Sequence, residues 1–488
     1  MHGTENKTYS RSAVFLVFLL AFFVRLYHLN IPFVEPYNNM TRQAVGAMIA
    51  KNFYSHGFRF LYPEIDMNGN GYSLFDAEMP VYAYLSAIAY WLAGGIKEWA
   101  ARSVSVGFSM STLVFMYLLV KRFVDGEIAL YALIFLAFSP LSVALGRSIQ
   151  PEALMLAGSA GAMYFFCVYQ DSGKARDLGF SALWLWLAIA SKVFAIFLFI
   201  PMIWLAWTRR GVKIFHDAGN YLFAILSCTA LAWYAYAWIL GRQHELIYVS
   251  LNYNRGPSFY AVWDLFRWHY LVKCSKVFFW HLLTAPGFVL CFVGFFHKKS
   301  SVKNFFILWF FALAFYTLIF WRIFIDHSYY QLPYLLPLSY FVAKGVVAAK
   351  HYLSQKGPLL KKSAIGLLAI VLIGNCAYLY RGLYFLNADA GRILHTGEAV
   401  QRLTRPEDLV IASDGRPPMI YYSHRKGWEF YYNEQTIEQF EQLRVKGASY
   451  FVSMDPIGLS SAIEFNHYLQ SHYRLIETTS EYVIYDLK

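Results

Sequence analysis

The chain contains 488 residues, of which 58% are hydrophobic, 19% are aromatic and only 15% are charged. Soluble domains carry about a quarter charged residues, so this composition excludes a soluble enzyme. A disordered chain and a small disulfide-stapled secreted module are excluded as well, because the hydrophobic residues form long blocks over most of the chain. The composition is typical of a polytopic α-helical membrane protein.

Charge divides the chain into two parts. Residues 387–488 contain 10 Lys/Arg and 14 Asp/Glu, a net charge of −4, whereas residues 1–386 carry a net charge of +16. We therefore predict a transmembrane domain at 1–386 and a separate domain at 387–488. Anionic lipid and membrane orientation explain the positive charge of the first part. We expect membrane lipids and no nucleic acid among the partners.

Eleven apolar segments are long enough to be candidate membrane spans, which need about 20 mostly apolar residues. They begin near Ser12, Ser103, Glu127, Ala153, Leu178, Val193, Gly219, Phe279, Asn304, Tyr330 and Lys362. The N-terminal segment lacks a small-residue cleavage site, so it is interpreted as a retained first span. The segment 79–95 is apolar but short, and it begins beside Glu78 and Pro80.

Positive charge in the loops decides whether 79–95 crosses. If it does not, 17 Lys/Arg fall in the inner loops and the short outer loops hold only Arg147, Lys192 and Arg322. If it does cross, every later loop changes side and the positive-inside rule is violated repeatedly. The sequence therefore predicts about 11 transmembrane helices, a cytoplasmic N-terminus and an extracytoplasmic C-terminal domain.

Three outer segments follow from this topology: 28–102, 241–278 and 387–488. In the first, the apolar spacing of Met40–Phe58 and of 80–95 predicts two helices lying along the membrane surface. The last segment alternates short apolar strands with helical stretches, which predicts a small α/β domain. The expected strands include Leu409–Ala412, Tyr450–Ser453 and Tyr482–Tyr485, and Thr436–Val445 is an expected helix.

Ionisable residues beside apolar spans are costly and usually mark a site or a structural pair. Here they concentrate on the predicted outer side. The acidic candidates are Glu35, Glu64, Asp66, Asp76, Glu78, Glu152, Asp264 and Asp326, and the basic candidates are Arg25, Arg42, Arg147, Lys192, Arg322 and His327. Cations facing carboxylates suit a lipid-phosphate substrate, because cations hold the phosphate while a carboxylate accepts a proton from the nucleophile.

Structural alternatives stand beside these roles. In the first outer segment, Glu35 could be solvated, Asp66 could be a turn residue and Glu78 could cap the second surface helix. Arg147 and Glu152 could form a structural ion pair across the Pro151 turn.

Other candidates have structural alternatives too. Lys192 interrupts an apolar stretch and either extends harmlessly to the membrane surface or holds an anion. His327, which precedes Tyr329 and Tyr330, is equally compatible with a structural role or a ligand contact. The five cysteines form no metal-type pair, and neither a metal site nor a cofactor is predicted.

The order of several short motifs resembles the bacterial glycosyltransferase family 39 type of GT-C membrane proteins. Relatives of this type include protein O-mannosyltransferases and the lipid A aminoarabinose transferase. The motifs are Arg42-Gln43-Ala44, Ile49-Ala50-Lys51-Asn52-Phe53, Tyr62-Pro63 with Asp66, Glu78-Met79-Pro80-Val81-Tyr82, Glu98-Trp99-Ala100-Ala101-Arg102, Arg147 with Pro151-Glu152-Ala153, Ser191-Lys192, and His327-Ser328-Tyr329-Tyr330-Gln331-Leu332-Pro333. The resemblance covers roughly residues 12–350. A further motif, Tyr421–Trp428 (YYSHRKGW), resembles a feature of one bacterial subgroup.

The resemblance implies a polyprenyl-phosphate sugar donor and an active site on the extracytoplasmic face. It further implies a first-loop carboxylate as general base, for which Glu78, Asp66 and Glu35 are the candidates. Lys192 matches a lysine of the family at the outer end of a span, and Arg147 with Glu152 matches its third-span motif. Together with Arg42, His327 and Tyr330, these residues are the substrate-binding candidates. The chain departs from many relatives at the start of the first surface helix, where Asn38-Asn39 replaces an acid.

The function expected on this basis is transfer of a sugar from a polyprenyl phosphate to a lipid, glycan or protein acceptor of the bacterial cell envelope, at the inner membrane. Two alternatives remain open. One is a non-catalytic lipid- or glycan-binding membrane protein on the same scaffold. The other is a lipid-linked sugar transporter, although internal repeats and broken midplane helices, apart from the interruption at Lys192, are absent from the sequence.

Overall fold

The computed structural model describes residues 11–32, 40–71, 73–75, 78–243, 267–297, 301–357, 388–413 and 416–488, and single positions between 362 and 385. The chain divides into two compact units. The helical unit comprises Met1–Leu29, Arg102–Tyr236 and Leu251–Arg381. The mixed unit comprises Asn30–Ala101, Ala237–Ser250 and Gly382–Lys488. Most of the first outer segment thus belongs to the same compact unit as the C-terminal segment.

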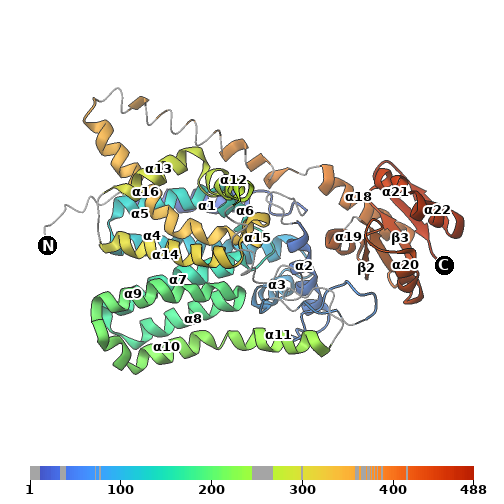
Figure 1. The fold of residues 1–488 in the computed structure, drawn as a ribbon, viewed down its shortest axis with the longest axis horizontal. Coiled ribbons are helices and arrows are strands. Elements are labelled where there is room, and N and C mark those ends of the chain that lie inside the picture. Colours follow the sequence, from blue (N-terminus) through green and yellow to red (C-terminus); the bar gives the residue numbers. More distant parts are fainter. Residues whose placement is uncertain are drawn as a thin grey trace. The chain divides into compact units, whose positions relative to one another are not determined.

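The helical unit is built from helices that run side by side (Figure 1). They are α1 (Arg11–Leu26), α4 (Glu98–Phe123), α5 (Gly126–Phe138), α6 (Pro140–Leu145), α7 (Glu152–Ser172), α8 (Ala175–Ser191), α9 (Phe199–Arg210), α10 (Ala218–Cys228), α11 (Leu231–Gln243), α12 (Trp268–Lys276), α13 (Thr284–Phe296), α14 (Ser301–Ile319), α15 (Trp321–Asp326) and α16 (Leu335–Ser354), with short 3₁₀ or π turns at Val193–Leu198, Gly211–His216, Val277–Leu282, Ser328–Tyr330 and Leu332–Tyr334.

Six of the described segments are long and apolar enough to cross a membrane. They are Glu98–Phe123, Glu152–Ser172, Val193–His216, Ala218–Gly241, Val302–Ile319 and Ser328–Ser354. A bent pair, Trp268–Trp280 with Thr284–Phe296, makes up to seven. The chain is therefore a multi-pass helical protein, as predicted, while fewer described helices than the predicted eleven meet this criterion. The segment 79–95 forms the 12-residue helix α3 (Val81–Leu92), which is too short to span a bilayer.

Glycines allow helices of the bundle to pack closely, as small residues do in membrane helix pairs. A Cβ atom at Gly294 of α13 would lie 1.9 Å from the carbonyl oxygen of Phe341, and one at Gly345 of α16 would lie 1.9 Å from that of Leu290. Neither position tolerates a side chain without separating α13 from α16. The sequence places both glycines inside apolar segments, but only the packing shows why they are needed.

Ion pairs mark one end of the helical unit. Arg122, in the last turn of α4, donates to Asp171 near the end of α7 at 2.8 Å, and Arg209 of α9 also binds Asp171. Lys350 of α16 binds Glu127 at the start of α5 at 2.5 Å. These residues lie in or beside loops that the sequence predicts on the positively charged side. Those loops therefore gather at the same end of the bundle.

The mixed unit contains two helices of the first outer segment, α2 (Met40–Ser55) and α3 (Val81–Leu92), and the C-terminal α/β fold. The C-terminal elements are α18 (Ala388–Leu403), β1 (Leu409–Ser413), α19 (Arg416–Ser423), β2 (Gly427–Phe430), α20 (Ile437–Val445), β3 (Ala448–Ser453), α21 (Pro456–Ser461), α22 (Ile463–His472), β4 (Arg474–Thr478) and β5 (Val483–Asp486). The strand order is β2-β1-β3-β5-β4, with β1 parallel to β2 and β3, and β5 antiparallel to its neighbours. The predicted small α/β domain is thus present.

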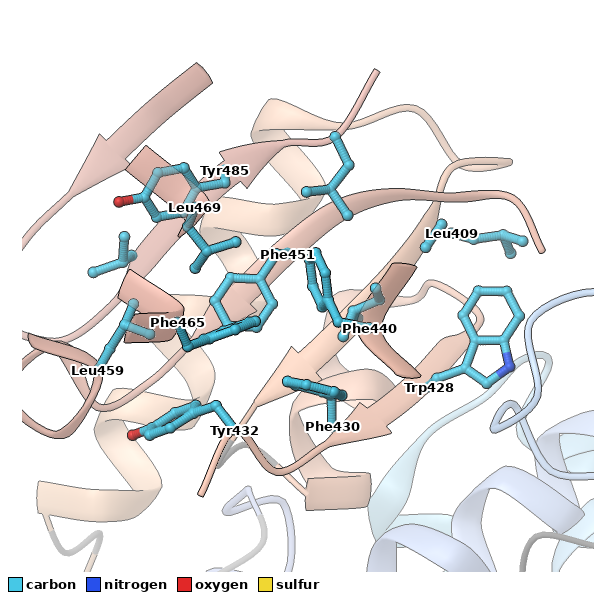
Figure 2. Close-up of a cluster of buried hydrophobic side chains, with 14 residues drawn as sticks. Leu409, Trp428, Phe430, Tyr432, Phe440, Phe451, Leu459, Phe465, Leu469 and Tyr485 are labelled. Carbon is cyan, nitrogen blue, oxygen red and sulfur yellow. The ribbon is translucent and has the colours of Figure 1, made fainter. Parts of the chain in front are cut away.

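Alternation along the strands builds the core of this domain. Side chains of successive strand residues point to opposite faces, so Leu409 and Ile411 share one face of β1. They join Phe440 of α20, Phe451 of β3 and Phe465 of α22 in a buried cluster (Figure 2). The helices α18 and α19 pack together and α19 contacts β1. The sheet thereby lies between two layers of helices.

A segment within residues 28–102 extends this sheet. Met67 forms a parallel bridge with Gly427 at the start of β2, and the Gly427 amide donates to the carbonyl oxygen of Asp66 at 3.1 Å. The Trp428 indole donates to the Asn68 side chain at 3.2 Å. The loop therefore adds a short edge to the C-terminal sheet, a backbone pairing across more than 350 residues of sequence that periodicity could not predict.

Candidate active site

A buried ion pair lies at the other end of the helical unit. Lys192 Nζ is 3.1 Å from Glu152 Oε1, and the side chains are 8% and 0% exposed. The ammonium group also lies 5.3 Å from the ring centre of Tyr329 and 5.1 Å from that of Tyr330, within cation–π range. Glu152, Val193 and Ser328 each begin a candidate membrane span. The pair therefore lies where three spans begin.

The backbone explains the position of Lys192. Helix α8 ends at Ser191 because Lys192 is extended, with φ −154° and ψ 116°, and a 3₁₀ turn begins at Val193. The freed carbonyl groups at the end of α8 accept hydrogen bonds from the Tyr234 hydroxyl, at 2.8 Å for Ile189 and 3.3 Å for Ala190. The predicted interruption of the apolar stretch is thus a break between two helices that turns the lysine toward Glu152.

Buried polar atoms around this pair lack hydrogen-bond partners among the described residues. They are both amide atoms of Gln150, the hydroxyl of Tyr316 and the second carboxylate oxygen of Glu152. Tyr316 packs with Met155, which lies one helical turn from Glu152, and with Tyr330. Buried polar groups are normally satisfied. Water or a polar ligand at this site would satisfy them.

Arg147 and Glu152 do not form the structural ion pair that the sequence made possible. Within the described residues Glu152 pairs with Lys192, while Arg147 Nη2 donates to the carbonyl oxygen of His28 at 2.7 Å. Both side chains are buried. Arg147 instead links the end of α1 to the loop before α7, and the Glu152 carboxylate lies at the N-terminus of α7, where the helix dipole favours an anion.

His327 belongs to the aromatic group beside Lys192. Its ring stacks on Tyr329 at 5.2 Å and lies 6.3 Å from Tyr330, whose ring is 5.9 Å from Phe194. The structure therefore brings together four predicted site residues of the helical unit: Glu152, Lys192, His327 and Tyr330. Whether His327 contacts a ligand stays a prediction.

The mixed unit holds the first-loop carboxylates, and each described candidate base is in an ion pair. Glu78, just before α3, pairs with Arg42 in the first turn of α2, and the side chains are 12% and 14% exposed. The Arg42 guanidinium also lies 5.2 Å from the centre of the Phe75 ring. Glu35 lies outside the described residues. The Arg42–Glu78 pair connects the start of α2 to the segment that precedes α3.

Asp66 is the most enclosed of these carboxylates. Its side chain is 1% exposed and pairs with Lys51 of α2, and Asn52 Nδ2 donates to it at 3.2 Å. The Asn52 amide also donates to the Glu64 carbonyl oxygen at 3.0 Å. Asp66 is thus tied to α2 by two side chains.

Several residues at these sites carried no role in the sequence prediction. Lys51 and Asn52 were visible within a motif, but their partner lies in a hairpin 14 or 15 residues later. Gln150 and Tyr316 are a neutral amide and a single hydroxyl. Only their burial without partners sets them apart from ordinary polar residues.

Comparison with known families covers part of the chain. A sequence profile of the family described as dolichyl-phosphate-mannose-protein mannosyltransferase matches residues 77–238. This range contains Glu78, Arg147, Glu152 and Lys192. No curated protein sequence matches the chain.

Comparison of folds covers nearly all of it, and the class of fold is that of GT-C glycosyltransferases. ArnT from Cupriavidus metallidurans in the apo state matches with a TM-score of 0.63 and 11% identity over 98% of each chain. The same protein bound to undecaprenyl phosphate matches with a TM-score of 0.62, 10% identity and coverage of 98% of this chain and 99% of that one. The Archaeoglobus fulgidus oligosaccharyltransferase matches with a TM-score of 0.61, 12% identity and coverage of 96% and 73%. The resemblance to GT-C proteins predicted from the motifs is confirmed, and at these identities it concerns the fold.

Proposed function

We propose that the protein is a membrane glycosyltransferase of the family 39 type that moves a sugar from a polyprenyl phosphate to a cell-envelope acceptor. The observation that carries this proposal is the buried Lys192–Glu152 pair, surrounded by polar atoms that lack partners, at the start of three candidate spans. A buried cation there suits a phosphate whose prenyl chain extends along the spans. The match to ArnT, one of whose structures holds undecaprenyl phosphate, supports the same donor class.

In this proposal the acceptor hydroxyl attacks the anomeric carbon of the donor sugar. A new carbon–oxygen bond forms, the bond from that carbon to the phosphate oxygen breaks, and a first-loop carboxylate takes the hydroxyl proton. Glu78, Asp66 and Glu35 are the candidates for this base. Lys192 and Arg147 stabilise the charge of the departing lipid phosphate, with Arg42 as a further candidate.

Other residues have supporting roles in the proposal. Glu152 orients Lys192, as their 3.1 Å contact supports. Tyr330 and His327 place aromatic surface and polar groups beside the ammonium group. No metal and no cofactor are part of the reaction as proposed.

We place this reaction at the outer face of a bacterial inner membrane. The proposed topology has eleven crossings, a cytoplasmic N-terminus, functional domains at 1–386 and 387–488, and an extracytoplasmic C-terminal domain. The gathering of basic loops at one end of the helical unit supports it, because cytoplasmic loops collect Lys and Arg. The donor-site residue Glu152 begins α7, and Lys192 directly precedes the span Val193–His216. Both residues therefore lie at the ends of these spans that are opposite to the basic loops.

A donor assay tests the function. The purified protein in lipid is incubated with radiolabelled polyprenyl-phosphate sugars and an envelope extract, and label leaving the prenyl lipid is measured. We expect transfer by the wild-type chain and none by Lys192→Met. Lys213→Met is the matched control, because Lys213 is exposed in the turn between α9 and α10. Failure of the wild-type chain to bind any donor would contradict the family inference itself.

A second candidate is a lipid- or glycan-binding protein that has lost catalysis. Asn38-Asn39 at the start of the first surface helix favours it, because an amide cannot accept the proton. Tight donor binding without transfer in the same assay would select this candidate. The transporter alternative predicts instead that labelled lipid changes leaflet without losing its sugar.

A further inference from the structure

A polar cavity of about 450 Å³ lies within the mixed unit. Three segments line it: the second half of α2 (Lys51, Asn52, Ser55, His56), the first-loop hairpin (Asp66, Asn70) and two loops of the C-terminal fold (Pro406, Glu407, Leu409 and His424, Arg425, Lys426). Its volume falls in the range of small-molecule sites.

The cavity lies at an unusual edge of the sheet. The lining loops precede β1 and β2, so it borders the amino ends of these parallel strands, whereas ligands of open parallel sheets usually bind beyond the carboxyl ends. The first-loop segment supplies the missing wall, because Asp66 joins the edge of β2 through the Gly427 amide. The cavity therefore exists only where the first outer segment and the C-terminal fold meet within this unit.

Positive charge predominates in the lining. Lys51 is balanced by Asp66, but Arg425 is buried and donates hydrogen bonds to neutral groups, namely the Thr404 hydroxyl and backbone carbonyl oxygens, at 2.8 to 3.3 Å. Lys426 makes no ion pair with a described residue. Glu407 is the other acid of the lining, and it pairs with Arg405 at 3.4 Å.

The pKa of His424 reflects the same positive charge in the lining. Burial lowers its pKa, and the positive charges of Lys51 and Arg425 lower it further, against the opposing effect of Asp66. Its backbone is also in the left-handed region, with φ 52°, which is uncommon for residues other than glycine. The Arg425 guanidinium holds this backbone by donating to the carbonyl oxygens of Ser423 and His424, each at 3.3 Å. Held backbone strain of this kind concentrates at functional sites.

The side chains exclude several occupants. Only Pro406 and Leu409 are apolar, which does not suit a prenyl or acyl chain. No phenylalanine, tyrosine or tryptophan lines the cavity, so an uncharged sugar would find no aromatic platform. Among the described residues no group of three or more His, Cys, Asp or Glu side chains suits a metal ion. Amides, a hydroxyl, histidines and a lysine without an ion pair among the described residues together match a sugar that carries a negative charge.

We propose that this cavity binds a sugar bearing a phosphate or carboxylate group, as part of the acceptor glycan. Lys426 and His424 face the anionic group, the buried charge of Arg425 adds to their attraction, and Asn52, Asn70 and Ser55 bind the ring hydroxyls. This assignment of the ligand as an acceptor rests on the proposed glycosyltransferase function, whereas binding itself does not. The motif Tyr421–Trp428, left without a role by the donor chemistry, thereby gains one.

Binding is tested on the full chain in lipid nanodiscs by saturation-transfer NMR with glucose 6-phosphate, glucuronic acid and glucose. We expect binding of one or both charged sugars and not of glucose, and Lys426→Gln should weaken it about tenfold, the loss of one charge-assisted contact. Lys446→Gln is the matched control, because Lys446 is exposed after α20 outside the cavity. Equal binding by wild type and Lys426→Gln, or equal binding of glucose, would overturn the proposal.

The transfer assay separates this proposal from the proposed function. With a donor that is turned over, Lys426→Gln should raise the KM for the acceptor about tenfold while leaving the donor KM and the kcat at saturating acceptor unchanged. An unchanged acceptor KM would reject the acceptor role although the protein is a transferase. Anionic sugar binding that depends on Lys426 in a chain that transfers nothing would reject the transferase and retain the binding site. Thermal unfolding of each variant shows whether it is folded.

Discussion

The ion pairs of the two units differ in what surrounds them. In the helical unit, Lys192 and Glu152 are enclosed by aromatic and apolar side chains and by polar atoms without partners. In the mixed unit, Lys51 and Asp66 are joined by Asn52 and border a polar cavity. The same pair of charges is therefore exposed to different dielectric surroundings. Burial makes the first pair costly to break, whereas the polar neighbours of the second pair lower the free-energy cost of removing one of its charges.

The largest effect is expected at Lys192. Lys192→Met leaves the Glu152 carboxylate buried without its cation, and breaking a buried pair in this way costs about 3 kcal/mol or more. We therefore expect a clear fall in thermal stability and loss of sugar transfer. Differential scanning fluorimetry in detergent and the donor assay measure the two effects.

A double variant separates stability from function at this pair. Lys192→Met combined with Glu152→Met removes both charges, so most of the lost stability should return. Transfer should stay absent, because the phosphate would lack its cation. Recovery of transfer in the double variant would mean that the pair is only structural.

The two ion pairs can also be compared directly. Lys51→Met should lower the thermal stability less than Lys192→Met does, and the reverse order would contradict the proposed difference between the units.

The next largest effect is expected among the first-loop acids. Removing a general base lowers rates by about 10² to 10⁴, so one of Glu78→Gln, Asp66→Asn and Glu35→Gln should reduce kcat by at least that lower factor. Single-turnover transfer with saturating donor measures it. Glu464→Gln, at an exposed position on α22, is the control. Full activity in all three variants would eliminate a carboxylate base in the first outer loop.

Backbone packing gives a smaller, purely structural comparison. A Cβ atom at Gly427 would lie 1.9 Å from the Val410 carbonyl oxygen, within the pairing of β1 and β2. Gly427→Ala should destabilise the protein by about 1–3 kcal/mol, and Gly294→Ala should do the same at the α13–α16 contact. Gly391→Ala should raise stability slightly, because Gly391 lies in α18 with open space around it. Equal melting temperatures for all three would refute the packing assignments.

In each unit, the sequence predicts the helices and strands better than the contacts between them. Apolar block length identified the six described segments that meet the criterion for a membrane span, and short apolar runs identified β1, β3 and β5. Two strands were missed for physical reasons. β4 (Arg474–Thr478) is a partly exposed edge strand, so it lacks the continuous buried apolar run that marks β1. β2 is only four residues long and contains glycine and glutamate.

The sequence could not predict which of these residues contact one another. Lys192 and Glu152 each stood out as charges beside apolar spans, but their contact depends on how α7 packs against the end of α8. The alternative partner, Arg147, is much nearer to Glu152 along the chain and was therefore the natural expectation. The cavity required still more, since the hairpin at Asp66 meets loops more than 330 residues later.

The smallest effect is expected in the pH dependence of anion binding to the cavity. Because burial, Lys51 and Arg425 lower the pKa of His424, the ring is neutral near pH 7 and gains a proton only below the ordinary histidine value of about 6.5. The proton adds a positive charge, so the affinity for glucuronic acid, whose carboxylate stays ionised in this range, should rise as pH falls. The charged or titratable groups that share the cavity are Lys51, His56, Asp66, Glu407, Arg425 and Lys426.

Histidine variants test this pH dependence. His424→Gln should reduce the rise in affinity at low pH, and His56→Gln separates the contribution of the second histidine. His395→Gln, which removes an exposed ring paired with Glu481 elsewhere in the unit, is the control. A pH profile of His424→Gln that equals the wild-type profile would remove His424 from the anion site while leaving Lys426 to be judged by its own variant.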